Sequence, residues 1–205
     1  MITSIKSPLK THPIRSLAVA VGSAIVLSAC GGGGGHKTPT DMTELRIVHA
    51  SVDAPKVKIM AAGSLLEAGK AYDYKESTPT LLRNPGSVDL VIKAQLPAGK
   101  ELDVINAQGV KLAADQEYEV FAIGGVANKT LEPFIFARPD KFNTANVRVS
   151  VAHLTSGAPM VDVYVTAPGA SLAASAKLGS FAYKGTLGPV EIPEGNYQIR
   201  VTASG

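Results

Sequence analysis

Residues 45–61 read LRIVHASVDAPKVKIMA, and this stretch decides the fold class. Within it, Val57, Ile59 and Ala61 alternate with Lys and Met residues. Strict alternation predicts a strand with one face on a core and one face in water, which is typical of antiparallel sheets. The turn residues Asp-Ala-Pro at 53–55 separate this strand from an earlier one that begins near Leu45.

The same period of two recurs along the chain. It is found at residues 147–152, 161–166 and 197–202. Only the segments 64–70 and 171–177 favour a short helical turn. Many short strands separated by Gly and Pro turns predict an all-β fold, an antiparallel β-sandwich of the immunoglobulin-like or Greek-key type.

An internal repeat indicates that this β-unit occurs twice. Residues 45–60 match residues 149–164, with His49 aligned to His153, 104 positions later. Further on, the offset becomes 109, where a Tyr-x-Tyr-Lys segment that begins at Tyr72 matches a Phe-x-Tyr-Lys segment. Matches in constant order, with one short insertion, predict two copies of one unit rather than a single large domain.

The second copy is shorter than the first. The first module is expected over residues 44–142, close to the roughly 100 residues of a seven-strand sandwich, and the second over residues 143–205. The strand-like segment 118–124 has no counterpart in the second copy. A half sandwich would expose its core face and unpaired strand edges. We therefore expect a fragment, or a second copy that borrows an edge from the first copy or from another molecule.

The N-terminal residues predict export. The first 15 positions carry three basic residues and no acid, and the apolar run at 16–27 follows. That run is shorter than the roughly 20 residues that a membrane-spanning helix needs, so residues 1–29 are expected to be a secretory signal peptide. Leu-Ser-Ala before Cys30 matches a lipobox, with cleavage between Ala29 and Cys30.

Cys30, the only cysteine, is the predicted site of lipidation. A thiol can carry diacylglycerol through a thioether, and each buried methylene contributes about 0.8 kcal/mol to membrane binding. Residues 30–43, rich in glycine, are expected to form a flexible tether with a span of about 20 Å. The protein is therefore expected in the cell envelope, lipid-anchored to the membrane, with the outer membrane favoured in a Gram-negative host.

Charge and motif content exclude several function classes. Of 20 Lys and Arg residues, three leave with the signal, so 17 remain against 17 Asp and Glu. No clustered basic face is evident, and nucleic acid is not expected as a partner. The mature sequence has no Cys/His zinc spacing, phosphate loop or dinucleotide motif, so no metal or cofactor is expected.

The segment His-Ala-Ser-x-Asp-Ala-Pro at 49–55 resembles a bacterial family called domain of unknown function 4397. Residues 161–164, Val-Asp-Val-Tyr, are similar to the second strand of its signature, and residues 118–124 resemble its closing strand. The resemblance implies an exported β-sandwich module, often in tandem, with no agreed activity. Two departures are Lys58, where the family often has Asp, and residues 154–157, which lack the acid of the first turn.

Five residues are weak candidates for binding: His49, Asp53, Tyr72, Tyr74 and His153. Each histidine falls at the end of a strand, just before a turn. We expect its imidazole to hydrogen-bond to the backbone of that turn. A ligand-binding or catalytic role is the less favoured alternative. Asp53 is expected to accept from turn backbone. The tyrosines are expected to pack with one ring inward and one at the rim, or else to form a sugar-stacking platform.

Two other groupings have an ordinary explanation. A triad of His49, Ser51 and Asp53 is rejected, because all three lie in one short segment and no oxyanion-hole loop is visible. The alternating acids Asp115, Glu117 and Glu119 are expected to be a solvated strand face rather than a weak Ca²⁺ site.

These observations predict a non-enzymatic envelope lipoprotein without catalytic residues. Its tandem modules would serve a structural, adhesive or interaction role toward envelope protein or glycan. Two alternatives stay open, a small-ligand or polysaccharide-binding lipoprotein and, less favoured, an envelope hydrolase that uses the His49 region.

Overall fold

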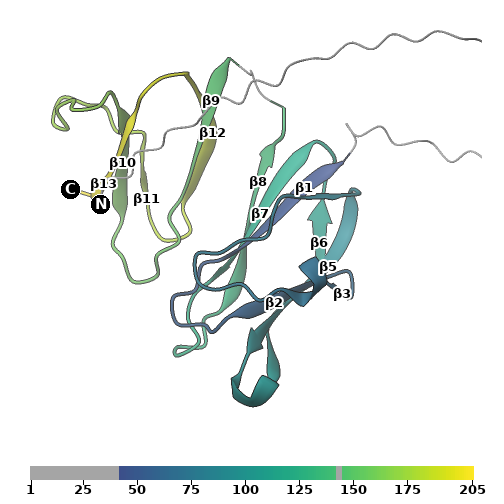
Figure 1. The fold of residues 1–205 in the computed structure, drawn as a ribbon. Coiled ribbons are helices and arrows are strands. Elements are labelled where there is room, and N and C mark those ends of the chain that lie inside the picture. Colours follow the sequence, from purple (N-terminus) through teal and green to yellow (C-terminus); the bar gives the residue numbers. More distant parts are fainter. Residues whose placement is uncertain (1–41, 142–144) are drawn as a thin grey trace, which may run out of the picture. The chain divides into compact units, whose positions relative to one another are not determined.

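The computed structural model describes residues 42–141 and 145–205, which form strands with almost no helix (Figure 1). The all-β expectation is confirmed. The predicted signal peptide, Ala29, Cys30 and the tether as far as residue 41 lie outside the described residues. Within the described ranges, no helix is long and apolar enough to cross a bilayer.

The first copy folds into two four-stranded sheets. One has the order β4 (Leu81–Arg83), β1 (Thr43–His49), β7 (Gln116–Ile123) and β8 (Glu132–Pro139). The other has the order β3 (Ser64–Leu65), β2 (Val57–Ala61), β5 (Gly86–Gln95) and β6 (Glu101–Leu112). Neighbouring strands are antiparallel except β1 and β7, which run parallel with Ile47 opposite Val120. A parallel pair needs a long crossover, here the whole segment from β2 to β6.

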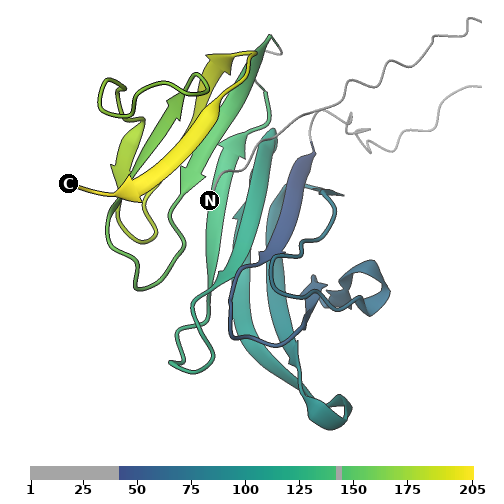
Figure 2. The same ribbon diagram turned by 60° about the vertical axis from the view of Figure 1, so that its left-hand side comes forward.

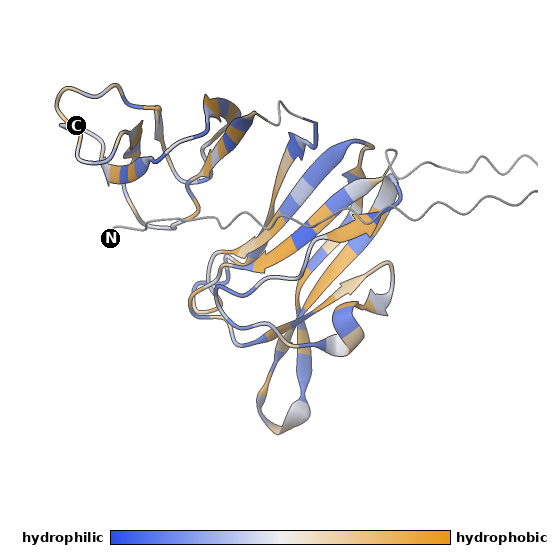
Figure 3. Cartoon of the chain, turned by 45° about the horizontal axis from the view of Figure 1, so that its top comes forward, coloured by the Kyte–Doolittle hydropathy of each residue, from blue (hydrophilic) through white to orange (hydrophobic). Residues whose placement is uncertain are grey.

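The core of the first copy lies between these sheets, because alternate residues of each strand point inward. Figure 3 shows the resulting alternation of hydrophobic and hydrophilic residues along the strands. The buried core includes Leu45, Ile47, Val57, Ile59, Tyr72, Leu90, Ile92, Ile105, Val110, Leu112, Tyr118, Val120 and Ala122. Burial of one such side chain contributes about 1.5–3 kcal/mol, so this core is the main source of stability.

The second copy forms two smaller antiparallel sheets (Figure 2). One has the order β11 (Gly179–Phe181), β10 (Val161–Thr166) and β13 (Gln198–Ala203). The other pairs β12 (Thr186–Pro193) with β9 (Asn146–Ala152). Among the described residues, no sheet combines strands of both copies. Within these ranges, each copy pairs only its own strands.

Two local expectations need correction, at residue 43 and at 171–177, whereas a short helical turn is present within 64–70 as expected. Thr43, assigned to the tether, is fully buried as the first residue of β1, and its hydroxyl donates to the carbonyl oxygen of Gln116 at 2.9 Å. The segment 64–70 begins with β3 and continues as one 3₁₀ turn, Leu66–Gly69. The segment 171–177 has bends and a hydrogen-bonded turn but no helix, since an isolated helix of this length is unstable without tertiary packing.

Candidate functional site

His49 ends β1, and its side chain is 1% exposed. The ring Nε2 lies 3.0 Å from the carbonyl oxygen of Pro55. Because a carbonyl oxygen can only accept, we assign the proton to Nε2, which donates this bond. The imidazole thus ties the end of β1 to the segment that leads into β2. This hydrogen bond to the backbone of the turn is the interaction expected from the sequence.

His153 occupies the same place in the second copy. Its Nε2 lies 3.1 Å from the carbonyl oxygen of Pro159, which again is six residues further on. The backbone N–H of Thr155 points at its other ring nitrogen, at 3.4 Å. The same histidine-to-backbone hydrogen bond therefore occurs in each of the two copies.

In each copy, a lysine with an unusual backbone conformation hydrogen-bonds to the backbone of this histidine. Lys75 donates its backbone N–H to the carbonyl of His49 at 2.8 Å, and Lys184 donates to that of His153 at 2.7 Å. These lysines have φ angles of 73° and 65°. Few residues with a Cβ adopt this left-handed conformation. The sequence gives no sign of it, because glycine rather than lysine is the usual residue there.

Asp53 joins two loops that are distant in sequence. Its carboxylate accepts the backbone N–H groups of Val126 at 2.9 Å and Ala127 at 3.0 Å, in the loop after β7. Ser51 Oγ adds a third bond at 3.2 Å. The bonds from Ala127 and Val126 favour the ionised form and lower the pKa of Asp53 below its usual range. The partner of Asp53 therefore lies in another loop, not further along its own turn.

The second copy has Gly157 at the position that matches Asp53. Among the described residues, the second copy has no strand equivalent to β7, and so no loop after it. The described residues of the second copy thus have neither the acid nor a strand in the place of β7.

The geometry around Ser51 does not form a catalytic relay. The Ser51 hydroxyl is buried and donates to Asp53, while the ring of His49 bonds Pro55. A nucleophile must instead be bonded to its base. The three residues of the rejected triad are all engaged in holding loops.

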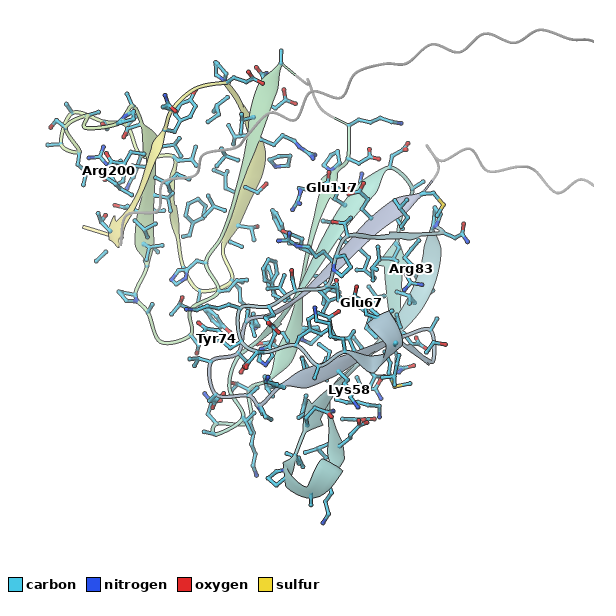
Figure 4. All side chains as sticks on the ribbon, in the orientation of Figure 1. Lys58, Glu67, Tyr74, Arg83, Glu117 and Arg200 are labelled. Atoms are coloured by element: carbon cyan, nitrogen blue, oxygen red, sulfur yellow. The ribbon has the colours of Figure 1, made fainter. Side chains whose placement is uncertain are left out.

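The two tyrosines lie in different environments. Tyr72 is fully buried, and its hydroxyl donates to Glu67. Burial, followed by the bond to Glu67, raises the pKa of Tyr72 well above its usual range. Tyr74, labelled in Figure 4, is 39% exposed. Its ring packs edge-on against that of His49, with the ring centroids 6.4 Å apart. A sugar-stacking platform would need exposed ring faces, and Tyr72 offers none.

The acidic stripe of β7 is paired with arginine rather than solvated. Arg138 Nε lies 2.6 Å from Glu117, labelled in Figure 4, and its Nη1 lies 2.9 Å from Glu119. Arg46 adds a contact of 3.0 Å to Glu119. Both glutamate side chains are only 16% exposed, so the expectation of a solvated face is wrong. No local sequence pattern connects these arginines with the acids, because cross-strand register places Arg138 opposite Glu117 and Arg46 opposite Glu119.

No cation site accompanies these acids in the structure. Asp115 is bound to Lys141 at 2.8 Å. In the part of the chain that the structure describes, no group of three or more His, Cys, Asp or Glu side chains could hold a metal ion.

A buried carboxylate in the second copy also escaped the sequence analysis. Asp162 of β10 accepts from Ser180 Oγ at 2.5 Å and from Ser204 Oγ at 3.0 Å, and Lys177 lies 3.4 Å away. The bond from Ser180 is the leading reason that the pKa of Asp162 is lowered. The only sequence signal was an acid between the valines of an alternating strand.

Comparison with known proteins gives one match. A family model with the description domain of unknown function (DUF4397) matches residues 43–164. The match starts at the first residue of β1 and ends within β10. It therefore covers the whole first copy and the start of the second, including the turn after His153. It confirms the resemblance seen at residues 49–55. No curated protein and no solved structure matches the chain.

Proposed function

We propose that this chain, which belongs to the DUF4397 family, is an envelope-anchored lipoprotein. Its tandem β-sandwich modules would be displayed as interaction surfaces with a structural or adhesive role. The observation that carries the proposal is the lipobox that ends at Cys30, followed at once by five glycines. A thiol at that position has a specific chemical use, as the acceptor of a diacylglycerol group.

The distance from the lipid to the folded protein supports this arrangement. β1 begins at Thr43, 13 positions after Cys30. A glycine-rich chain of that length spans about 20 Å. The first module would therefore stay close to the bilayer surface, where it can meet other envelope components.

The state of the signature residues supports an interaction role over a catalytic one. His49 and Asp53 bond backbone groups, and Ser51 bonds Asp53. Each signature side chain is used to fix a turn or to join two loops. Contacts with partners would then be made by exposed surfaces of the modules.

Metabolic labelling with a palmitate analogue tests the anchor. The wild-type protein should be labelled and recovered in the membrane fraction. Cys30→Ser should lose the label and keep its signal peptide. Gly33→Ser, in the same glycine run, is the matched control and should label like wild type. A wild-type protein that stays unlabelled, with Cys30→Ser fractionating identically, would refute the proposal.

A further inference from the structure

A cavity beside the end of β1 brings the signature histidine together with a tyrosine and a lysine. Its lining includes Val48, His49, Tyr74, Lys75 and Phe121, and residues of the turn after the second histidine complete it. Lys75 is exposed, and its ammonium lies 5.1 Å from the centroid of the Tyr74 ring. Val48 and Phe121 are opposite each other in the β1–β7 pair. The cavity therefore combines a cation with apolar and aromatic walls.

Two polar groups of this cavity have no partner in the described part of the chain. His49 donates from Nε2 to Pro55, and its other ring nitrogen, Nδ1, is buried and forms no hydrogen bond there. Within the same residues, no Asp or Glu forms an ion pair with Lys75. Buried polar atoms in folded proteins nearly always have a partner. The cavity therefore offers one acceptor and one cation to a ligand.

The second copy shows which groups these two side chains bind. In the internal repeat they recur as His153 and Lys184. The Nδ1 atom of His153 accepts the backbone N–H of Thr155 at 3.4 Å. Lys184, whose ammonium also lies over a tyrosine ring, pairs with the carboxylate of Glu132 at 2.6 Å. An amide N–H and a carboxylate are thus the partners that the first copy lacks.

The backbone of the turn does not require a lysine at this position. The φ angles are 73° at Lys75 and 65° at Lys184, and glycine adopts such angles without steric cost. Both copies nevertheless have a lysine there, with its ammonium over a tyrosine ring. Strained backbone conformations occur preferentially at functional sites. The lysine is therefore better explained by its side chain than by the turn.

The two acids of the same turn are engaged elsewhere. Asp73 accepts the backbone N–H of Tyr74 at 2.8 Å and lies 3.6 Å from the ammonium of Lys56. Glu76 accepts the backbone N–H of Asp73 at 2.7 Å. These carboxylates bond the turn itself or another lysine. The ammonium of Lys75 is therefore available to an anion from outside.

We propose that this cavity binds the free carboxyl end of a peptide, or an N-acylated amino acid of the same chemistry. The carboxylate would pair with Lys75, and the amide N–H beside it would donate to Nδ1 of His49. An apolar side chain would pack on Val48 and Phe121. Tyr74, which is 39% exposed, would turn aside to uncover Nδ1. Capture of a terminal carboxylate is an established mode of peptide recognition.

N-acetylphenylalanine is the probe for this site, which would serve the interaction role proposed above. It is titrated into the isotope-labelled chain from residue 30 onward with Cys30→Ser, and the shifts of the amide signals give the Kd. N-acetylphenylalaninamide lacks the carboxylate, 3-phenylpropionate lacks the amide, and N-acetylglycine lacks the apolar side chain. Each should bind about tenfold more weakly. An amide that binds as tightly as the acid would overturn the proposal.

Variants of the lysine locate the site. Lys75→Gly should fold like wild type, because glycine fits the turn, but should bind the probe at least tenfold more weakly. Lys75→Arg should keep most of the affinity. Lys129→Gly is the matched control, since Lys129 is also exposed, has a φ of 56° and lies outside the cavity. Unchanged affinity in Lys75→Gly would refute the site.

A longer peptide that ends in phenylalanine distinguishes two sources of the ligand. Equal affinity for the peptide and for N-acetylphenylalanine would assign the site to the terminal residue alone. Tighter binding of the peptide would assign it to the ends of polypeptides. Binding of neither would overturn the proposal. Palmitate labelling is independent of these titrations, so failure of the anchor and failure of this site are distinguishable.

Discussion

At the scale of the residue, the side chains of the family signature at 49–55 form hydrogen bonds within the module. The ring of His49 bonds Pro55, and the carboxylate of Asp53 bonds the loop after β7. Sequence alignment within the chain predicted that His49 and His153 are equivalent, and the bonds of both rings agree with it. It could not predict the partners of Asp53, because a contact across 73 positions leaves no local pattern.

His49→Ala should destabilise the first module by about 2–4 kcal/mol. The change leaves a cavity and a carbonyl oxygen without its donor. Urea denaturation followed by circular dichroism measures the loss. Val52→Ala, at a largely exposed position of the same loop, is the control and should change stability by less than about 0.5 kcal/mol. Equal effects of the two variants would contradict a stabilising role for the hydrogen bond of His49 to Pro55.

Acid should release the loop that Asp53 holds. The folded pKa is below the unfolded value, so the stabilisation is complete above about pH 4, the usual pKa of Asp. It is lost as the pH falls through the folded pKa. The protection of the Val126 and Ala127 amides, taken relative to the intrinsic exchange rate at each pH, should therefore fall in acid. In Asp53→Asn this protection should be low at every pH, and a protection profile that matches wild type would count against the link.

At the scale of the element, strand pairing explains what alternation alone could not. The sequence predicted β2 at 57–61 and β10 at 161–166 with the bounds that the structure shows. Alternation identifies a strand and its two faces, but it says nothing of which strand lies beside it. The parallel pairing of β1 with β7 and the arginine partners of the β7 acids both depend on that register.

Arg138→Ala should cost the first module about 1–3 kcal/mol. Glu117 and Glu119 would each lose one of two arginine partners while they remain mostly buried, with Arg148 left on Glu117 and Arg46 left on Glu119, and a weakly compensated charge is expensive there. Thermal or urea unfolding measures the effect. Arg138→Lys should restore only part of the stability, since one ammonium cannot serve both carboxylates as the guanidinium fork does. If Arg138→Ala is as stable as wild type, the ion pairs of Arg138 with Glu117 and Glu119 make no net contribution to stability.

At the scale of the whole molecule, two copies of one unit differ in the number of strands that the structure describes. The first has eight strands and a continuous core, whereas five strands form the described part of the second. The internal repeat predicted that residues 45–60 and 149–164 are equivalent, and β1 and β9 begin the two stretches. It could not predict which strands pair, because pairing depends on tertiary packing.

The two copies should unfold separately, the second first. Exposed apolar positions such as Val201 contribute little to its stability, so the amides of β10 should exchange faster than those of β5. Ile59→Ala should accelerate exchange only in the first copy, and Val163→Ala only in the second. Native-state exchange followed by mass spectrometry resolves the two. A single cooperative transition that both substitutions shift together would contradict this expectation.

The position of β1 has a mechanical consequence. The strand begins where the N-terminal segment ends and is held on both sides, by β4 and by the parallel strand β7. A pull applied at the N-terminal end of this strand would load its hydrogen bonds to both neighbouring strands in shear, many at once. Under the lipid anchor proposed above, the first module would be held to the membrane through this strand.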